Sequence, residues 1–104
     1  MELLTEELRR TLPPLYATEG VSDPLVVAKF FLPATGWTWY ATEFDGEDVF
    51  FGYVVGQYPE LGYFSLHELE EVRGPFDLAV ERDHFEVMPL SKVRMIHEPD
   101  RRTF

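Results

Sequence analysis

The sequence predicts a small α+β domain, in which a twisted antiparallel sheet of about four to five strands is accompanied by two short helices. Three observations support this prediction. The chain has 104 residues, the length of a single domain. Aromatic residues make up 15% of it and concentrate in β-rich runs that tight turns separate. Two short segments have helical apolar spacing and begin at residues that commonly cap helices.

The N-terminal part supplies one helix and two strands. Residues 3–12 have the spacing of a short amphipathic helix, with Thr5 as its N-cap and Pro13-Pro14 ending it. Residues 25–32 are nearly all apolar, which indicates a strand buried on both faces. Residues 37–44 form the next predicted strand. Strict alternation assigns Trp37, Trp39, Ala41 and Glu43 to one face of this strand, and Thr38, Tyr40, Thr42 and Phe44 to the other.

A hairpin organises the middle of the chain. The dipeptide Asp45-Gly46 is a strong hairpin signal. It leads into a strand over residues 49–55, where Gly52 leaves room for a bulge or a large neighbouring ring. Residues 56–60 then form a turn, and residues 61–64 are expected to form a short fourth strand.

A second helix follows this strand directly. Ser65 and Glu68 fit a capping box, in which each side chain satisfies a free backbone amide of the first turn. Leu66 and Leu69 then face the core at helical spacing, and Gly74-Pro75 stops the helix.

The C-terminal part has weaker signals. Residues 78–80 and 84–88 are expected to form short strands. Residues 89–96 fit either a strand or a turn of helix. Residues 97–104 are expected to be a flexible tail of the single domain that spans residues 1–104.

Composition limits the possible functions. The net charge of -10 argues against direct binding to nucleic acid or to anionic membranes, both of which require Lys and Arg. With no cysteine, disulfides and thiolate metal sites are excluded. Residues 1–12 do not resemble a leader peptide, and the apolar runs fall far short of the roughly 20 residues that span a bilayer. We therefore expect a cytoplasmic protein without a cofactor.

Negative charge is concentrated in the middle of the chain. Residues 30–81 contain ten acids and one cation, Arg73. Carboxylates at this spacing can imitate phosphates toward a basic cleft, although a solvated face is the alternative interpretation. Two tyrosines next to a turn would be typical interface anchors. The expected partner-binding residues are the carboxylates Glu43, Asp45, Glu47, Asp48, Glu68, Glu70 and Glu71, with the tyrosines Tyr58 and Tyr63 beside them.

Catalytic signals are weak by comparison. None of the three serines has an adjacent base, and no glycine lies in a phosphate-binding motif, so we expect a protein that is not an enzyme. His84 and Glu86 would share a strand face and could be two ligands of a metal-dependent hydrolase. Residues 81–84 are interpreted as a structural ion-pair cluster.

The chain resembles a small family catalogued as domain of unknown function 2958. The resemblance rests on WYATEFDG, FGYV, LGYFSL-ELEEVRGP and ERD, and on the opening LLTEELRRTLPPLYATEG. It runs from Leu3 to about Leu90, and the tail beyond departs from the pattern. Members of that family occur largely on plasmids, conjugative elements and phages, and relatives are grouped with inhibitors of CRISPR–Cas9. The family supplies no catalytic residues to transfer.

Charge and resemblance together suggest a counter-defence protein of the anti-CRISPR or antirestriction type. It would act as a DNA mimic on a protein partner, a nuclease of a CRISPR or restriction system. The alternative is a non-catalytic interaction module of a plasmid or phage element that binds through an aromatic surface. Its candidates are Trp37, Trp39, Tyr40, Tyr53, Tyr58 and Tyr63, of which Tyr58 and Tyr63 are expected to be exposed. The alternative interpretation is that these rings belong to the core, as in most aromatic-rich strands.

Overall fold

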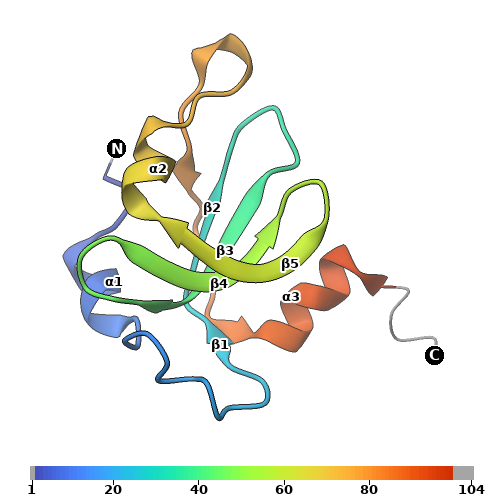
Figure 1. The fold of residues 1–104 in the computed structure, drawn as a ribbon. Helices are drawn as coiled ribbons and strands as arrows, with labels where there is room; N and C mark the ends of the chain where they lie inside the picture. The colour runs from blue at the N-terminus through green and yellow to red at the C-terminus, as the bar shows by residue number, and fades with distance from the viewer. Residues whose placement is uncertain (1, 100–104) are drawn as a thin grey trace.

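The computed structural model describes residues 2–99 as an α+β fold built on one antiparallel sheet (Figure 1). This confirms the predicted fold class. A separate two-stranded ribbon pairs β1 (Leu25–Val26) with β7 (Met88–Pro89). The five-stranded sheet has the spatial order β5 (Pro59–Ser65), β4 (Val49–Val55), β3 (Thr38–Phe44), β2 (Ala28–Phe31) and β6 (Glu81–Arg82).

The predicted helix starts are confirmed by their caps. Helix α1 (Glu6–Thr11) begins after Thr5, whose hydroxyl accepts a hydrogen bond from Leu8 N at 3.1 Å. Helix α2 (Leu66–Glu71) begins after Ser65, whose hydroxyl accepts from Glu68 N at 3.2 Å. Each cap satisfies an amide that the first helical turn leaves free. A short 3₁₀ helix, η1 (Pro75–Asp77), and helix α3 (Leu90–His97) complete the helices of residues 2–99.

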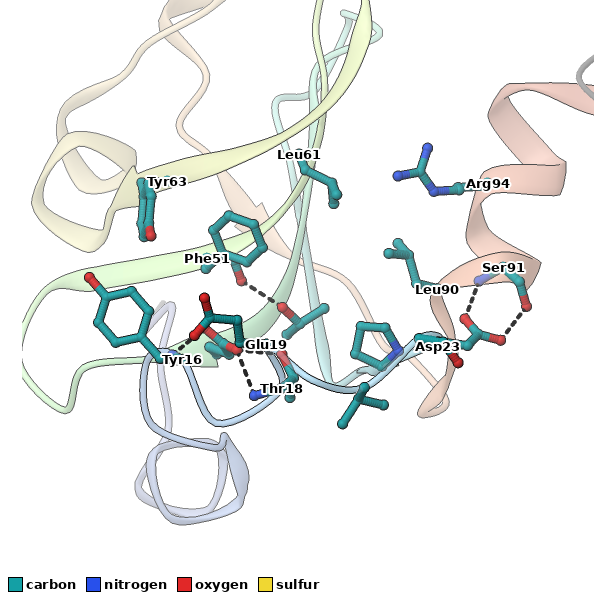
Figure 2. Close-up of a pocket in the computed structure, with 15 residues that line it drawn as sticks. Tyr16, Thr18, Glu19, Asp23, Phe51, Leu61, Tyr63, Leu90, Ser91 and Arg94 are labelled. Atoms are coloured by element: carbon teal, nitrogen blue, oxygen red, sulfur yellow. Dashed lines mark hydrogen bonds between the residues drawn. The ribbon is translucent and has the colours of Figure 1, made fainter.

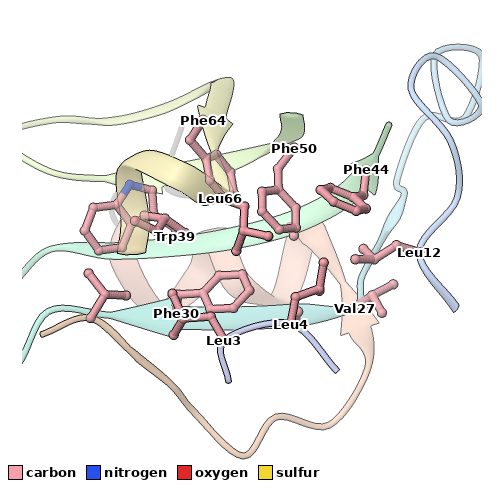
Figure 3. Close-up of a cluster of buried hydrophobic side chains, with 14 of the residues drawn as sticks. Leu3, Leu4, Leu12, Val27, Phe30, Trp39, Phe44, Phe50, Phe64 and Leu66 are labelled. Atoms are coloured by element: carbon pink, nitrogen blue, oxygen red, sulfur yellow. The ribbon is translucent and has the colours of Figure 1, made fainter. Parts of the chain in front are cut away.

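One face of the sheet carries the larger hydrophobic core (Figure 3). The N-terminal leucines, the strands and α2 all contribute to it. Its centre is aromatic, because Phe50 stacks on Phe64 with ring centroids 5.0 Å apart and contacts Phe44 at 4.5 Å. Large rings give this short chain much buried apolar area per residue.

The opposite face carries a smaller core under α3. Tyr40 and Tyr53 from the sheet pack there with Val26, Leu90 and Val93. Both tyrosine hydroxyls bond to the end of α3: Tyr40 Oη lies 2.7 Å from His97 Nε2, and Tyr53 Oη donates to the Glu98 carboxylate. His97 and Glu98, the first two residues of the expected flexible tail, therefore pack against the sheet, and the prediction of a flexible segment is wrong for them. Residues 100–104 of that expected tail lie outside the described residues.

A β-bulge changes the faces of β3. Ala41 pairs with Gly52 but Glu43 pairs with Phe51, which leaves Thr42 as an extra residue. A bulge shifts the alternation by one residue, so every side chain beyond it changes face. Phe44 accordingly joins Trp39 and Ala41 in the larger core. Strict alternation was therefore wrong for Glu43, which lies on the face opposite Trp39.

Other strand boundaries also differ from the prediction. The expected strand over 25–32 is divided at Val27 into β1 and β2, which belong to different sheets. The predicted strands over 78–80 and 84–88 are wrong in extent, since Ala79 forms only an isolated bridge with Arg73 and the strands found are β6 and β7, of which only Met88 was predicted. These two-residue strands are set by partners distant in sequence, Phe31 and Val26, rather than by local alternation. Of residues 89–96, Pro89 ends β7 and the others belong to helix α3, and β5 is longer than expected.

Gly52 makes the bulge possible, and this can be tested. A Cβ at position 52 would lie 1.8 Å from Tyr40 O, whereas a Cβ on its cross-strand neighbour Gly62 would meet nothing within 4 Å. We expect Gly52→Ala to lower the free energy of unfolding by about 3 kcal/mol, because backbone cannot move aside easily. Gly62→Ala is the matched control and should be neutral or slightly stabilising. Urea denaturation of both variants measures this, and equal stability would contradict the explanation.

Candidate functional site

The tip of the β3–β4 hairpin is organised by the side chain of Asp45. Its Oδ1 accepts hydrogen bonds from the backbone amides of Glu47, Asp48 and Val49 at 2.8, 2.8 and 3.0 Å. These amides, with that of Glu47 first, hold the pKa of the Asp45 carboxyl below its ordinary value. Gly46 has φ of 92°, a conformation that favours glycine. Asp45 is therefore ionised and fixed in place.

Asp48 joins the hairpin to α2. Its carboxylate accepts from His67 N at 2.8 Å and from the Ser65 hydroxyl at 2.7 Å, and its carbonyl accepts from Leu66 N at 2.8 Å. The His67 amide, followed by the Ser65 hydroxyl, lowers the pKa of Asp48. A carboxylate at this position satisfies free amides of the first helical turn. The acidic hairpin and the acidic helix are consequently locked together.

The β3–β4 hairpin tip and α2, which carry these carboxylates, lie at the same end of the sheet (Figure 1). All of these carboxylates are exposed except Asp48, which is half-buried. We call this region the hairpin–α2 surface, and it consists of Asp45, Glu47, Asp48, Glu68, Glu70 and Glu71.

Two arginines border the hairpin–α2 surface. Arg9 from α1 donates to Gly46 O at 3.1 Å and lies over the Phe44 ring, 5.5 Å from its centroid. Arg73 donates to the carbonyls of Glu70 and Val72 at 2.8 and 2.9 Å. The charge is therefore less uniform than residues 30–81 suggested, because the fold brings Arg9 beside the hairpin. Both guanidinium groups contact carbonyl oxygens in these interactions rather than the carboxylates.

Glu43 does not belong to this surface. The side chain is only 4% exposed and lies on the face of α3. Its Oε1 accepts from Tyr16 N at 2.8 Å, and its Oε2 accepts from Thr18 N at 2.9 Å and from the Thr18 hydroxyl (Figure 2). Burial opposes ionisation, but these hydrogen bonds outweigh it and hold the pKa of Glu43 below its ordinary value. Its expected role as an exposed, phosphate-like charge is therefore wrong.

The two candidate tyrosines lie far apart. Tyr63 is 57% exposed, pairs across strands with Phe51, and packs against it with ring centroids 5.0 Å apart. Tyr58 is 76% exposed in the β4–β5 turn, five residues away along the edge strand. That separation is roughly 17 Å in an extended chain. Tyr63 lies in the cross-strand row of Glu43 and Phe51, whereas Tyr58 lies in the turn outside β5, so the predicted pair of anchors is divided.

An open cavity of about 640 Å³ lies beside Tyr63 (Figure 2). Strands β3, β4 and β5 form its floor, the loop before β1 forms one wall, and the start of α3 forms the other. Sequence reasoning missed this site because its walls come from segments distant in the chain. Tyr16, treated as part of a plain loop, is 63% exposed at the rim and has φ of 71°. Its aromatic character was visible in the sequence, but its position was not.

The expected metal-binding pair is not assembled. His84 and Glu86 are exposed in the connection between β6 and β7, which is not a strand. Within residues 2–99, no three His, Asp or Glu side chains converge closely enough to hold a metal ion. Among the helices of the same region, none has both the length and the apolar character needed to cross a bilayer.

The buried charge of Glu43 should stabilise the fold in a pH-dependent manner. Glu43→Gln removes charge-assisted hydrogen bonds and should lower the free energy of unfolding by about 2 kcal/mol at neutral pH. The folded-state pKa lies below the ordinary value of 4.5, so this contribution is complete above pH 4.5 and is lost as the pH falls through the folded-state pKa. The difference between parent and variant should therefore shrink in acid. Denaturant melts from neutral to acidic pH measure it.

Glu47→Gln is the control for this experiment, because Glu47 is exposed at the hairpin tip. Its stability should follow that of the parent at every pH. A Glu43→Gln deficit that persists unchanged in acid would show that lost packing, rather than lost charge, destabilises the variant.

Comparison with known protein families gives one match, which covers nearly all of the described residues. The family model described as protein of unknown function (DUF2958) matches residues 3–96. The match therefore continues beyond Leu90, where the resemblance was expected to end, and includes most of α3. No curated protein and no solved structure matches the chain. With a match over nearly all of its length, the chain belongs to the DUF2958 family.

Proposed function

We propose that this protein is a non-catalytic counter-defence protein that binds a nuclease of a CRISPR or restriction system. The hairpin–α2 surface would occupy the basic groove in which that nuclease holds DNA. The observation that carries the proposal is the double contact of Asp48 with Ser65 and His67, which fixes the two acidic elements against each other.

Rigid attachment matters because a charge mimic must present its carboxylates in a fixed arrangement. Flexible acids would lose side-chain and loop entropy on binding, and this loss would weaken the complex. Here Asp45 and Asp48 are held by backbone amides, and the same bonds lower the pKa of both groups. Their charge is maintained at any cellular pH. A dense negative surface also accelerates association with a basic partner.

The family resemblance supports the type of partner. The resemblance to a family found on plasmids, conjugative elements and phages, with relatives grouped with inhibitors of CRISPR–Cas9, favours a defence nuclease over other basic proteins. The net charge of -10 argues against a direct contact with the DNA itself. A cytoplasmic location follows from such a partner.

Charge reversal on the hairpin–α2 surface tests the proposal. Asp45 and Asp48 are unsuitable targets, since both carry structural hydrogen bonds. Glu47→Lys combined with Glu70→Lys changes exposed positions instead. We expect this double variant to inhibit DNA cleavage at least tenfold less well than the parent, on the order of the effect of several surface charges. Cleavage by a purified Cas9 ribonucleoprotein and by a restriction enzyme, each at low and high salt, provides the measurement.

The charge-matched control is Asp77→Lys combined with Glu86→Lys, which are exposed outside the hairpin–α2 surface. It should inhibit as the parent does, and inhibition by the parent should weaken as salt rises. The proposal fails if both double variants behave alike. It also fails if the parent inhibits neither class of nuclease at low salt.

A second candidate function is a protein-interaction module that binds through aromatic side chains. The exposed rings of Tyr16 and Tyr63 at the mouth of the cavity favour it. Aromatic anchors beside a concave site are typical of interface hot spots.

Salt and tyrosine variants distinguish this candidate from charge mimicry. If the module binds through aromatic contacts, partner capture from a host lysate should persist at high salt and be lost on Tyr63→Ala. Tyr58→Ala is the matched control, because Tyr58 is more exposed but lies at the other end of β5. The aromatic mode would be contradicted if both tyrosine variants lost the captured partner equally. It would also be contradicted if the parent lost the partner at high salt. Quantitative mass spectrometry of the captured proteins gives the readout.

A further inference from the structure

The cavity beside β5 has an aromatic end that is separate from the hairpin–α2 surface. Tyr16, Phe51 and Tyr63 converge there from the loop before β1, from β4 and from β5 (Figure 2). Phe51 and Tyr63 meet edge to face at 63°, and the Tyr16 and Tyr63 rings remain largely open to solvent. Aromatic faces that are arranged around an open space attract cations through the negative potential of their π-systems.

Negative charge predominates around the same cavity. Its lining includes the carboxylates of Glu19, Asp23 and Glu43 and a single guanidinium, that of Arg94. Arg94 is already engaged, because its Nη1 lies 3.3 Å from the Glu98 carboxylate and its guanidinium lies 5.1 Å from the centre of the Tyr53 ring. Asp23 is bound to Ser91 through Ser91 N at 2.9 Å and the Ser91 hydroxyl at 2.7 Å.

Glu43 is the buried charge of this cavity. No Lys or Arg side chain within residues 2–99 forms a salt bridge with it, and its carboxylate is held by hydrogen bonds from Tyr16 and Thr18. Its influence reaches the aromatic end. The pKa of Tyr63 is raised first by its interaction with the Tyr16 side chain, then by desolvation, and also by the charges of Tyr16, Glu43 and Glu19. A cation bound there would therefore be attracted by both carboxylates.

A strained residue, Tyr16, lies at the rim of the cavity and is fixed there by a hydrogen bond. Tyr16 has a φ of 71°, a backbone conformation that residues other than glycine rarely adopt. The bond from Tyr16 N to Glu43 at 2.8 Å fixes this conformation and brings the ring to the cavity mouth. Strained residues that the surrounding structure over-determines are typical of binding sites.

We propose that the aromatic end of this cavity binds an arginine side chain of a partner polypeptide. The planar guanidinium would pack against the tyrosine rings and bond to the exposed carboxylate of Glu19, while the buried charge of Glu43 supplies long-range attraction. Arginine fits better than lysine, because its delocalised charge is weakly hydrated and stacks on rings. A cavity of about 640 Å³ also leaves room for residues that flank the arginine along Leu61 and Leu90. This site extends beyond the binding proposed for the hairpin–α2 surface.

A peptide titration on the isolated protein tests the inference. The probe is the end-blocked pentapeptide Gly-Gly-Arg-Gly-Gly, and the readout is the amide chemical shifts of ¹⁵N-labelled protein. We expect shifts at Tyr16, Thr18, Phe51 and Tyr63, with a dissociation constant on the order of 1 mM for one side chain. Replacing arginine by uncharged citrulline should weaken binding about tenfold, and lysine should bind less tightly than arginine.

Protein variants locate the site. Glu19→Gln should weaken peptide binding at least about threefold. Tyr63→Ala should abolish the chemical-shift changes that the arginine peptide causes at Phe51. The matched controls are Glu86→Gln and Tyr58→Ala, which change exposed residues of the same types outside the cavity and should leave binding unchanged. The amide spectra themselves report whether each variant is folded.

Three results would overturn the inference: equal affinity for the arginine and citrulline peptides, shifts confined to the hairpin–α2 surface, or the absence of shifts up to tens of millimolar peptide. None of these depends on a nuclease partner. Failure of this site and failure of the proposed counter-defence function are therefore distinguishable.

Discussion

The bulge at Thr42 is the constraint on which the rest of this structure depends. By inserting one residue opposite Gly52, it directs Phe44 into the aromatic core and Glu43 to the opposite face. The buried carboxylate of Glu43 then accepts hydrogen bonds from the amides of Tyr16 and Thr18, and these bonds fix the loop before β1. Without this shift in alternation, an ionised glutamate would be directed into the hydrophobic core at a large energetic cost.

Acidic residues in this protein serve the fold as well as its surface. Asp45 accepts hydrogen bonds from backbone amides of the hairpin tip, and Asp48 joins the hairpin to α2. Asp23 accepts hydrogen bonds from Ser91 at the start of α3. Each of these carboxylates accepts a hydrogen bond from a backbone amide and has a lowered pKa. Amides are the main cause for Asp45 and Asp48, whereas for Asp23 the Ser91 hydroxyl comes first and the Ser91 amide second. A carboxylate used in this way keeps its charge while losing its freedom of movement. The same residues can therefore stabilise the domain and provide the fixed negative charges that a DNA mimic requires.

The two faces of the sheet are covered to different extents. One face is covered by the N-terminal segment and α2 and carries the larger core (Figure 3). The other is covered only in part, because α3 packs over Tyr40 and Tyr53 and leaves the cross-strand row of Glu43, Phe51 and Tyr63 beside an open cavity. The hairpin–α2 surface lies at the end of the sheet. The domain thus presents two chemically different surfaces, one charged and one aromatic.

The sequence by itself determined the locally specified elements of this protein. Caps at Thr5 and Ser65, the Asp45-Gly46 hairpin and the aromatic strands follow from short-range chemistry, so the fold class and most element types could be predicted. Only the tertiary structure decided what depends on distant partners: the two-residue strands β6 and β7, the face of Glu43, the separation of Tyr58 from Tyr63, and Arg9 beside the hairpin. The physical reason is that a bulge and an edge pairing are chosen by cross-strand geometry, which no local pattern encodes.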